Sequence, residues 1–240
     1  MALDHALMAR ARHAGEAVLR VYEWDGPVLS LGRNQRARGI YIDEELTHRG
    51  ISVVRRPTGG RALLHHREIT YSLTAPAVAG EHFGVMYRRF NVLLLEALST
   101  LGVAGALSEP AARSHSPTAM PCFAEPSAGE IVVAGRKLVG SAQWRDDGAL
   151  LQHGAILVDD DQALIPLLMH EPPAVSPPPA TLRDVLGRAP QAGEVASALF
   201  DAVRHSADPG ATPMSRDESA ALDTAPFLEI YRDPAWTWRR

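Results

Sequence analysis

The chain has 240 residues, of which 46% are hydrophobic, and this length and composition predict a globular protein with a substantial core. Its formal net charge of -4 at pH 7 argues against nucleic acid as a partner, because binding to phosphate backbones calls for a clearly basic face. With no uncharged apolar run of about 18 residues, and no basic segment followed by an apolar one at the N-terminus, we expect a cytoplasmic protein without a membrane partner.

Helix and strand patterns alternate through the first part of the chain. Helical spacing of apolar residues and short β-rich runs identify the elements, and Asp25-Gly26-Pro27 marks a turn between the first two strands. In chain order we predict a helix at 2–14, strands at 18–22 and 28–31, a short helix at 43–50, strands at 51–55, 63–64 and 69–73, and a long helix at 83–101 that stops at Gly102.

Two hairpins are expected in the middle of the chain. One turns at Ala134-Gly135-Arg136 between strands at 130–133 and 137–139, and the other turns at Asp147-Gly148 before further strands at 149–153 and 155–158. The pattern predicts an α+β fold, in which helices flank a mixed or antiparallel sheet.

The composition changes after residue 170. The prolines at 172–173 and 177–179 predict an extended surface linker over 171–190. Helix-compatible patterns follow at 181–186, 193–205 and 215–231, with Ser215 and Glu218 spaced as a capping box. We therefore predict a main domain at 1–170, the linker, and a small helical C-terminal extension at 191–240.

Cys122 is the only cysteine, which excludes an intramolecular disulfide and a cysteine-rich metal site. A lone cysteine is either a small buried hydrophobe or a reactive thiol. Pro121 and Pro126 flank it and favour a shaped loop over a helix or a central strand. That setting strengthens the interpretation of Cys122 as a nucleophile.

Lys137 is the candidate partner of this thiol. Period-two alternation places Lys137, Val139 and Ser141 on one face of the predicted strand, so the lysine could point into a cleft. An ammonium near a thiol favours the thiolate electrostatically and can orient the carbonyl of a bound acyl group. The alternative is an exposed hairpin lysine, because most lysines lie at the surface.

A twin glycine, Gly59-Gly60, suits a backbone that approaches a ligand closely, and arginines flank it on both sides. His65 and His153 are either proton carriers and acyl-site residues or hydrogen-bonded core residues. No metal-ligand pattern is present, because the adjacent His65 and His66 would face opposite ways on a strand.

Taken together, these segments resemble the biotin and lipoate protein ligase superfamily of cofactor transferases. The resemblance covers most of the chain. It is carried by residues 2–7, 29–35 and 55–72 and by the segments around Cys122, Lys137 and His153. Within the superfamily, residues 58–65, followed by 68–72 and by Pro121-Cys122-Phe123, look most like octanoyltransferases of the cysteine-loop type.

The resemblance implies transfer of an octanoyl group from octanoyl-acyl carrier protein to a lysine of a lipoyl domain, typically that of the glycine-cleavage H protein. Neither ATP nor a cofactor or metal would be needed. Cys122 would form the octanoyl thioester, and Lys137 would support the thiolate and place the carbonyl. The eight-carbon octanoyl chain would be buried among apolar strands, and this burial contributes about 0.8 kcal/mol per methylene. The implied substrate-binding residues are Arg55, Arg56, Gly59, Gly60, Arg61, His65, Gly140, Ser141, Ala142, His153 and Gly154.

Two departures from the family pattern matter. Arg61 stands where ATP-using lipoate ligases typically have a third glycine, which argues against adenylation. The chain also begins almost at its first helix, whereas relatives usually carry a short strand before it, so either the start is truncated or an edge strand is absent.

Three alternatives remain open. In an ATP-dependent lipoate ligase, Lys137 would help bind an acyl-adenylate and Cys122 would be incidental. A lipoyl-domain amidotransferase would share the scaffold and the cysteine intermediate. A non-catalytic acyl-carrier or lipoyl-domain binding protein would hold its partner without turnover.

Overall fold

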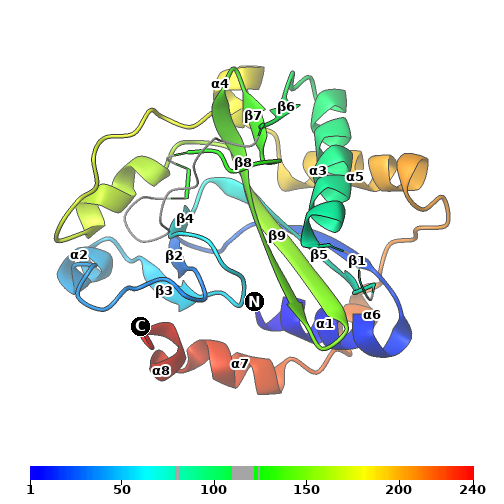
Figure 1. Cartoon of the computed structure of the whole chain (residues 1–240), viewed down its shortest axis with the longest axis horizontal. Helices are drawn as coiled ribbons and strands as arrows, with labels where there is room; N and C mark the ends of the chain where they lie inside the picture. The colour runs from blue at the N-terminus through cyan, green and yellow to red at the C-terminus, as the bar shows by residue number, and fades with distance from the viewer. Residues whose placement is uncertain (79, 81, 110–121, 124) are drawn as a thin grey trace.

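Two β-sheets form the framework of the chain (Figure 1). The structure is a computed structural model and describes residues 1–78, 80, 82–109, 122–123 and 125–240. The larger sheet is antiparallel, in the spatial order β1 (Val18–Tyr22), β5 (Glu68–Pro76), β9 (Ala149–Leu157), β8 (Arg136–Asp146), β7 (Ile131–Val133) and β6 (Ala106–Leu107). The smaller sheet is mixed, because β2 (Val28–Leu31) lies between the parallel β3 (Ser52–Arg55) and the antiparallel β4 (Leu63–His65). The predicted α+β class is confirmed.

Helices cover both faces of the larger sheet. They are, in chain order, α1 (Ala2–Ala14), α2 (Asp43–His48), α3 (Phe83–Thr100), the 3-10 helix η1 (Gln162–Leu168), α4 (Leu182–Leu186), α5 (Ala192–Ser206), α6 (Arg216–Ala220), α7 (Ala225–Arg232) and α8 (Pro234–Thr237). In Figure 1, α3 and α5 cross on one side of the sheet, and α1 lies near its other end with α7 beneath it. Within the described ranges, no helix combines the length and the apolar character that crossing a membrane requires.

The main core lies between the larger sheet and the pair α3 and α5. Phe90, Leu94 and Leu98 recur at helical spacing on α3 and are buried against Ile69 and Tyr71 of β5. The two strand residues are separated by one position and therefore point to the same face of the sheet. The helix predicted at 83–101 is thus confirmed to within a residue of its C-terminal end.

Both predicted hairpins form, for the reason that the sequence suggested. Ala134 and Gly135 have φ angles of 48° and 74°, and Asp147 and Gly148 have 43° and 78°. Positive φ at both central residues is the signature of the type I′ turn, whose twist matches that of antiparallel strands. The second hairpin joins β8 to β9 and so places Ser141 opposite Gly154.

The C-terminal part of the chain returns to the two sheets. Val195 and Leu199 of α5 belong to the main core, so this helix of the predicted extension packs on the larger sheet. The helical pattern at 215–231 forms two helices, α6 and α7, and the capping box of Ser215 and Glu218 is present. Farther on, the indole nitrogen of Trp236 donates to the carbonyl of Arg55, 2.8 Å away. The division of the chain into 1–170, 171–190 and 191–240 stays a prediction.

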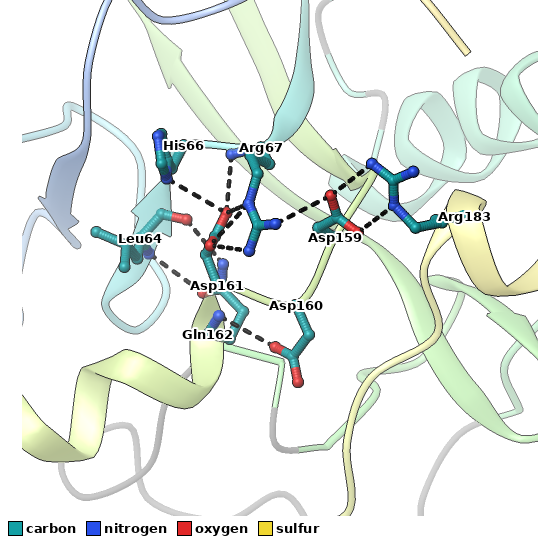
Figure 2. A network of polar contacts seen from close by, with 8 residues as sticks. All are labelled: Leu64, His66, Arg67, Asp159, Asp160, Asp161, Gln162 and Arg183. Carbon is teal, nitrogen blue, oxygen red and sulfur yellow. Dashed lines mark hydrogen bonds and ion pairs between the residues drawn. The ribbon is translucent and has the colours of Figure 1, made fainter. Parts of the chain in front are cut away.

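A polar network holds the turn between β4 and β5 in place (Figure 2). The carboxylate of the buried Asp161 accepts the backbone N–H of Arg67 at 2.9 Å and its guanidinium at 2.7 Å. Asp159 accepts from Arg67 at 3.2 Å and from Arg183 at 2.7 Å. The side chain of Gln162 bonds both the N–H and the C=O of Leu64, at 3.1 and 2.7 Å. These contacts fix β4, which carries His65 at its end.

Candidate active site

A cavity of about 230 Å³ opens between the two sheets and the segment around Cys122. It collects almost all the residues that the sequence singled out. The predicted site residues that line it are Arg56, Gly60, Arg61, His65, Cys122, Lys137, Gly140, Ser141, Ala142, His153 and Gly154. Further lining comes from residues that sequence reasoning missed, namely Met1, Tyr22, Trp24, Leu63, Thr70, Ser127 and Glu130.

Cys122 and Lys137 are in direct contact. The Nζ atom of Lys137 donates to the carbonyl oxygen of Cys122 at 2.8 Å and lies 3.6 Å from its sulfur. Lys137 is only 3% exposed, so the alternative of a solvated hairpin lysine is wrong. The Lys137 ammonium therefore supplies a positive charge next to the free thiol of Cys122.

The cysteine segment is also tied to the twin-glycine segment. The backbone N–H of Cys122 donates to the carbonyl of Ala62 at 3.0 Å, and Phe123 is buried against Leu63. This places Cys122 beside the start of β4. Pro121, on which the prediction of a shaped loop partly rests, lies outside the described residues.

Lys137 reaches the cavity because β8 contains a β-bulge. Ile131 pairs with Val139 whereas the next residue, Val132, pairs with Lys137, so β8 carries one extra residue at Leu138. The predicted alternation, with Lys137, Val139 and Ser141 on one face, is therefore wrong. Val139 packs in the main core, and Lys137 lies on the cavity side.

Ser141 points toward Tyr71, and the two side-chain oxygens are 2.5 Å apart. Burial raises the pKa of Tyr71 to about 12, so its hydroxyl is neutral at physiological pH. The contact fastens β8 to β5 at the cavity wall.

Arg56 organises the twin-glycine turn from within. It is buried, and its guanidinium donates to the carbonyls of Gly59 at 2.9 Å, Arg61 at 2.7 Å and Ser30 at 2.9 Å. Burial lowers the pKa of Arg56. Gly60 has a φ of 94°, and a Cβ there would lie 2.8 Å from the Arg56 guanidinium. The second glycine is therefore required by the turn geometry.

Arg55 and Gly59 are not among the residues that line the cavity. The Arg55 side chain is fully buried and points the other way, donating to Gly32 at 2.6 Å, to Gln35 at 2.8 Å and to Thr237 of α8 at 2.8 Å, in each case to the carbonyl oxygen. It ties the C-terminus to the smaller sheet. The structure therefore separates the two neighbouring arginines, since Arg56 faces the cavity and Arg55 does not.

The two histidines have different surroundings. The Nε2 atom of His153 lies 2.6 Å from the hydroxyl of Thr58, and burial lowers the pKa of His153 to about 3. This ring is therefore neutral at physiological pH. His65 is bonded through Nδ1 to Glu68 and through Nε2 to Ser30, both at 2.9 Å. Both rings are held in place at the cavity wall.

Glu130 is the chemically most significant residue that sequence reasoning missed. Its Oε2 atom lies 2.8 Å from Nζ of Lys137, and both side chains are nearly inaccessible to solvent. The sequence pattern that could have identified Glu130 is an acidic residue at the start of an apolar strand, across a predicted hairpin from the single lysine. In the described part of the chain, no group of three or more histidine, cysteine or acidic side chains is arranged to hold a metal ion.

Known proteins resemble the chain in sequence and in fold. Over an alignment of 263 residues, the chain is 37% identical to Octanoyltransferase LipM of Kyrpidia tusciae, and the alignment covers 100% of this chain and 94% of that protein. It is 42% identical over 165 residues to Octanoyltransferase LipM of Carboxydothermus hydrogenoformans, covering 67% of this chain and 61% of the relative. A bi-partite lipoate protein ligase of Thermoplasma acidophilum, studied with its E2 lipoyl domain, has the same fold, with a TM-score of 0.76, 19% identity, and coverage of 99% of this chain and 89% of that one.

The family of the chain follows from a match that extends through most of it. A family model described as the lipoyl protein ligase A/B catalytic domain matches residues 1–204, that is, from α1 into α5. The resemblance inferred from the sequence is confirmed by this match and by the relatives. The chain belongs to the lipoyl protein ligase A/B catalytic domain family.

Proposed function

We propose that this protein is an octanoyltransferase that carries an octanoyl group through a thioester on Cys122. The relatives at 37–42% identity are octanoyltransferases, which supports the acyltransferase class and octanoyl transfer in protein lipoylation. The single observation that carries the chemistry is the contact of the buried Lys137 ammonium with both the sulfur and the carbonyl oxygen of Cys122.

The reaction proceeds in two acyl-transfer steps. In the first, the Cys122 thiolate attacks the carbonyl carbon of the donor thioester, the bond to the donor sulfur breaks, and the donor leaves as its thiol after gaining a proton. In the second, a neutral lysine amine of the acceptor attacks the Cys122 thioester. The bond to Cys122 breaks, an amide forms, and the amine proton replaces the acyl group on the enzyme. Two steps of this kind are ordinary covalent catalysis.

The cavity provides room and polarity for these steps. Gly140, Ala142 and Gly154 give a wall of small residues next to Lys137, while Leu63 and Trp24 add apolar surface. Burying an acyl chain against such a wall contributes about 0.8 kcal/mol per methylene. We assign the octanoyl chain to this cavity.

The partners follow from the same chemistry. The acceptor is a lipoyl-domain protein, as in the Thermoplasma acidophilum lipoylation system, whose ligase was studied with an E2 lipoyl domain. We propose octanoyl-acyl carrier protein as the donor and the glycine-cleavage H protein as the acceptor. The proposed location of the reaction is the cytoplasm.

The test is transfer in the absence of ATP. Octanoyl-acyl carrier protein and apo H protein are mixed with the enzyme or with Cys122→Ser, and intact masses of enzyme and acceptor are followed. With the native protein we expect an octanoyl adduct on Cys122, followed by modification of the acceptor. With Cys122→Ser we expect neither. Transfer that appears only when ATP and free octanoate or lipoate are added would instead establish a ligase.

A second donor separates the transferase from the amidotransferase. Octanoylated H protein replaces octanoyl-acyl carrier protein, and an apo E2 lipoyl domain serves as the acceptor. The proposed transferase prefers the carrier protein as donor. Faster transfer from octanoylated H protein would assign the enzyme to amide exchange between lipoyl domains.

A further inference from the structure

Glu130 joins the elements that carry the two proposed catalytic residues. Its Oε2 atom accepts the Lys137 ammonium at 2.8 Å and the backbone N–H of Ser127 at 2.6 Å. Its Oε1 atom accepts the N–H of Ser141 at 3.4 Å. One buried carboxylate therefore connects the segment that follows Cys122, the lysine and the cavity strand β8.

The contacts of the Lys137 ammonium are unequal. A lysine ammonium has three N–H donors and no acceptor. The carboxylate of Glu130 and the carbonyl of Cys122 take the two short contacts, both 2.8 Å, whereas the Cys122 sulfur is at 3.6 Å. The main counter-charge of the lysine is thus Glu130, and it is present whether or not the sulfur carries a charge.

The state of the sulfur changes during the proposed reaction. As a thiolate, Cys122 is an anion that can stabilise the ammonium of Lys137; as an octanoyl thioester, it is neutral. A buried ammonium without a nearby anion is unfavourable, because nothing then offsets the hydration that it loses on burial. In the acyl-enzyme, Glu130 is therefore the anion that remains beside the Lys137 ammonium.

Other ionisable groups face the same cluster. Burial raises the pKa of Tyr71 to about 12 and that of Tyr87 still further, so both hydroxyls near Glu130 are neutral. Arg56 is buried on the Cys122 side and adds a second positive charge there. Neither tyrosine can replace the carboxylate, and the arginine is a cation.

We propose that Glu130 is a positioning residue of acyl transfer, whose carboxylate pairs with the Lys137 ammonium and holds it in place while Cys122 carries the acyl group. The inference rests on the proposed function, in which Cys122 is the nucleophile. In the second step Cys122 leaves as a thiolate, and the retained ammonium receives that charge. Glu130 therefore matters more for the second step than for the first. In the first step the Cys122 thiolate can itself pair with Lys137.

The test separates the two steps. Glu130→Gln keeps the shape of the side chain and removes the charge. The enzyme is first acylated with octanoyl-acyl carrier protein, the adduct is isolated, and apo H protein is then added while intact masses are followed. We expect the second step to slow roughly ten- to hundredfold, which is the rate equivalent of one lost charge-assisted hydrogen bond. The rate of the first step should change by less than about threefold. Equal slowing of both steps, or no slowing of either, overturns the proposal.

Two further variants provide the controls. Glu130→Asp keeps the charge on a shorter stem, so the second step should recover at least part of its rate; a rate no better than that of Glu130→Gln contradicts the proposal. If Glu130→Gln does not fold, the test relies on Glu130→Asp. Slowing of the second step alone then supports the proposal, and equal slowing of both steps overturns it. Glu68→Gln removes another buried carboxylate, which contacts His65, and should leave the ratio of the two rates unchanged. Native enzyme that forms no Cys122 adduct would refute the proposed function itself, a result distinct from any of these.

Discussion

The Lys137 ammonium lies 2.8 Å from the carbonyl oxygen of Cys122 and 3.6 Å from its sulfur. One side chain thus fixes the backbone of the proposed nucleophile and supplies the charge next to its thiol. The same group is also placed to interact with the oxygen of an acyl group bound to that sulfur. This double role makes Lys137 the most informative position to change.

Lys137→Met removes the charge and keeps much of the volume. We expect acylation of Cys122 to slow by about two orders of magnitude or more, because the thiolate and the developing oxyanion both lose their cation. The rate is measured by intact mass after mixing with octanoyl-acyl carrier protein. Near-native acylation in a folded variant would remove Lys137 from the mechanism.

Stability provides a second readout for the same pair. Lys137→Met leaves the buried Glu130 without its partner, which we expect to lower the free energy of unfolding by about 3–5 kcal/mol. The double variant Lys137→Met with Glu130→Gln should regain most of this stability and none of the activity. Chemical denaturation measures the first quantity, and intact mass the second. A double variant no more stable than Lys137→Met would contradict the assigned ion pair.

Gly140→Ala tests how closely the lysine is packed. An added Cβ would lie 3.1 Å from Cε of Lys137 and 3.1 Å from the ring of Phe123. Because Phe123 is buried, the lysine would have to move, and we expect acylation to slow by roughly tenfold, with a stability loss of about 1–3 kcal/mol. Gly193→Ala on α5, where a Cβ meets no atom within 4 Å, is the control and should leave acylation unchanged. Unchanged acylation in Gly140→Ala would show that Lys137 has freedom to move.

The two members of the twin glycine should respond differently to alanine. Gly60 has a φ of 94° and no room for a Cβ beside Arg56, so Gly60→Ala should lower the free energy of unfolding by about 1–3 kcal/mol. At Gly59 an added Cβ meets nothing within 4 Å, and φ lies outside the left-handed region. Gly59→Ala should therefore change stability by less than about 0.5 kcal/mol. Thermal denaturation of both variants checks the contrast, and equal losses would contradict it.

Local sequence signals were enough for most of the elements. The apolar period of α3 and the turn chemistry at Ala134-Gly135 and Asp147-Gly148 are properties of neighbouring residues, and they predicted a helix and two hairpins that the structure contains. The helical pattern at 215–231 was also local, but it did not reveal the break between α6 and α7. Where a pattern depends on adjacent residues alone, the sequence predicted the type of element but not every break within it.

The site depended on contacts that no local pattern encodes. A strict period of two would have placed Lys137 with Val139, and the bulge at Leu138 moved it to the other side. Arg55 and Arg56 share one motif but point to opposite sides of the strand end. Glu130 reaches Lys137 because a hairpin folds one strand back on the next. These placements arise from register and packing between strands, which are set by the whole sheet.

His153 should make stability depend on pH. Burial lowers the pKa of His153 to about 3, whereas an unfolded histidine titrates near about 6.5. Between these values the unfolded chain binds more protons, so stability is full above about pH 6.5 and decreases as pH falls toward about 3. At pH 5 the loss from this group is about 2 kcal/mol relative to pH 7.

The variant His153→Gln isolates this effect. It lacks the titrating ring and should show a smaller difference in the free energy of unfolding between pH 7 and pH 5 than the native protein. Urea denaturation at the two pH values measures it. An identical pH dependence in the variant would mean that other groups control acid sensitivity.

The network around Asp161 should stabilise the turn between β4 and β5 (Figure 2). Asp161→Ala removes the acceptor of both the backbone and the guanidinium of Arg67, and because Asp161 is buried we expect a loss of about 1–3 kcal/mol in the free energy of unfolding. Arg183→Ala breaks only an exposed pair with Asp159 and should leave the denaturation midpoint nearly unchanged. Because β4 ends at His65 in the cavity wall, Asp161→Ala should also increase amide hydrogen exchange in residues 63–65. Protection of those amides as in the native protein would show that β4 is held by the smaller sheet alone.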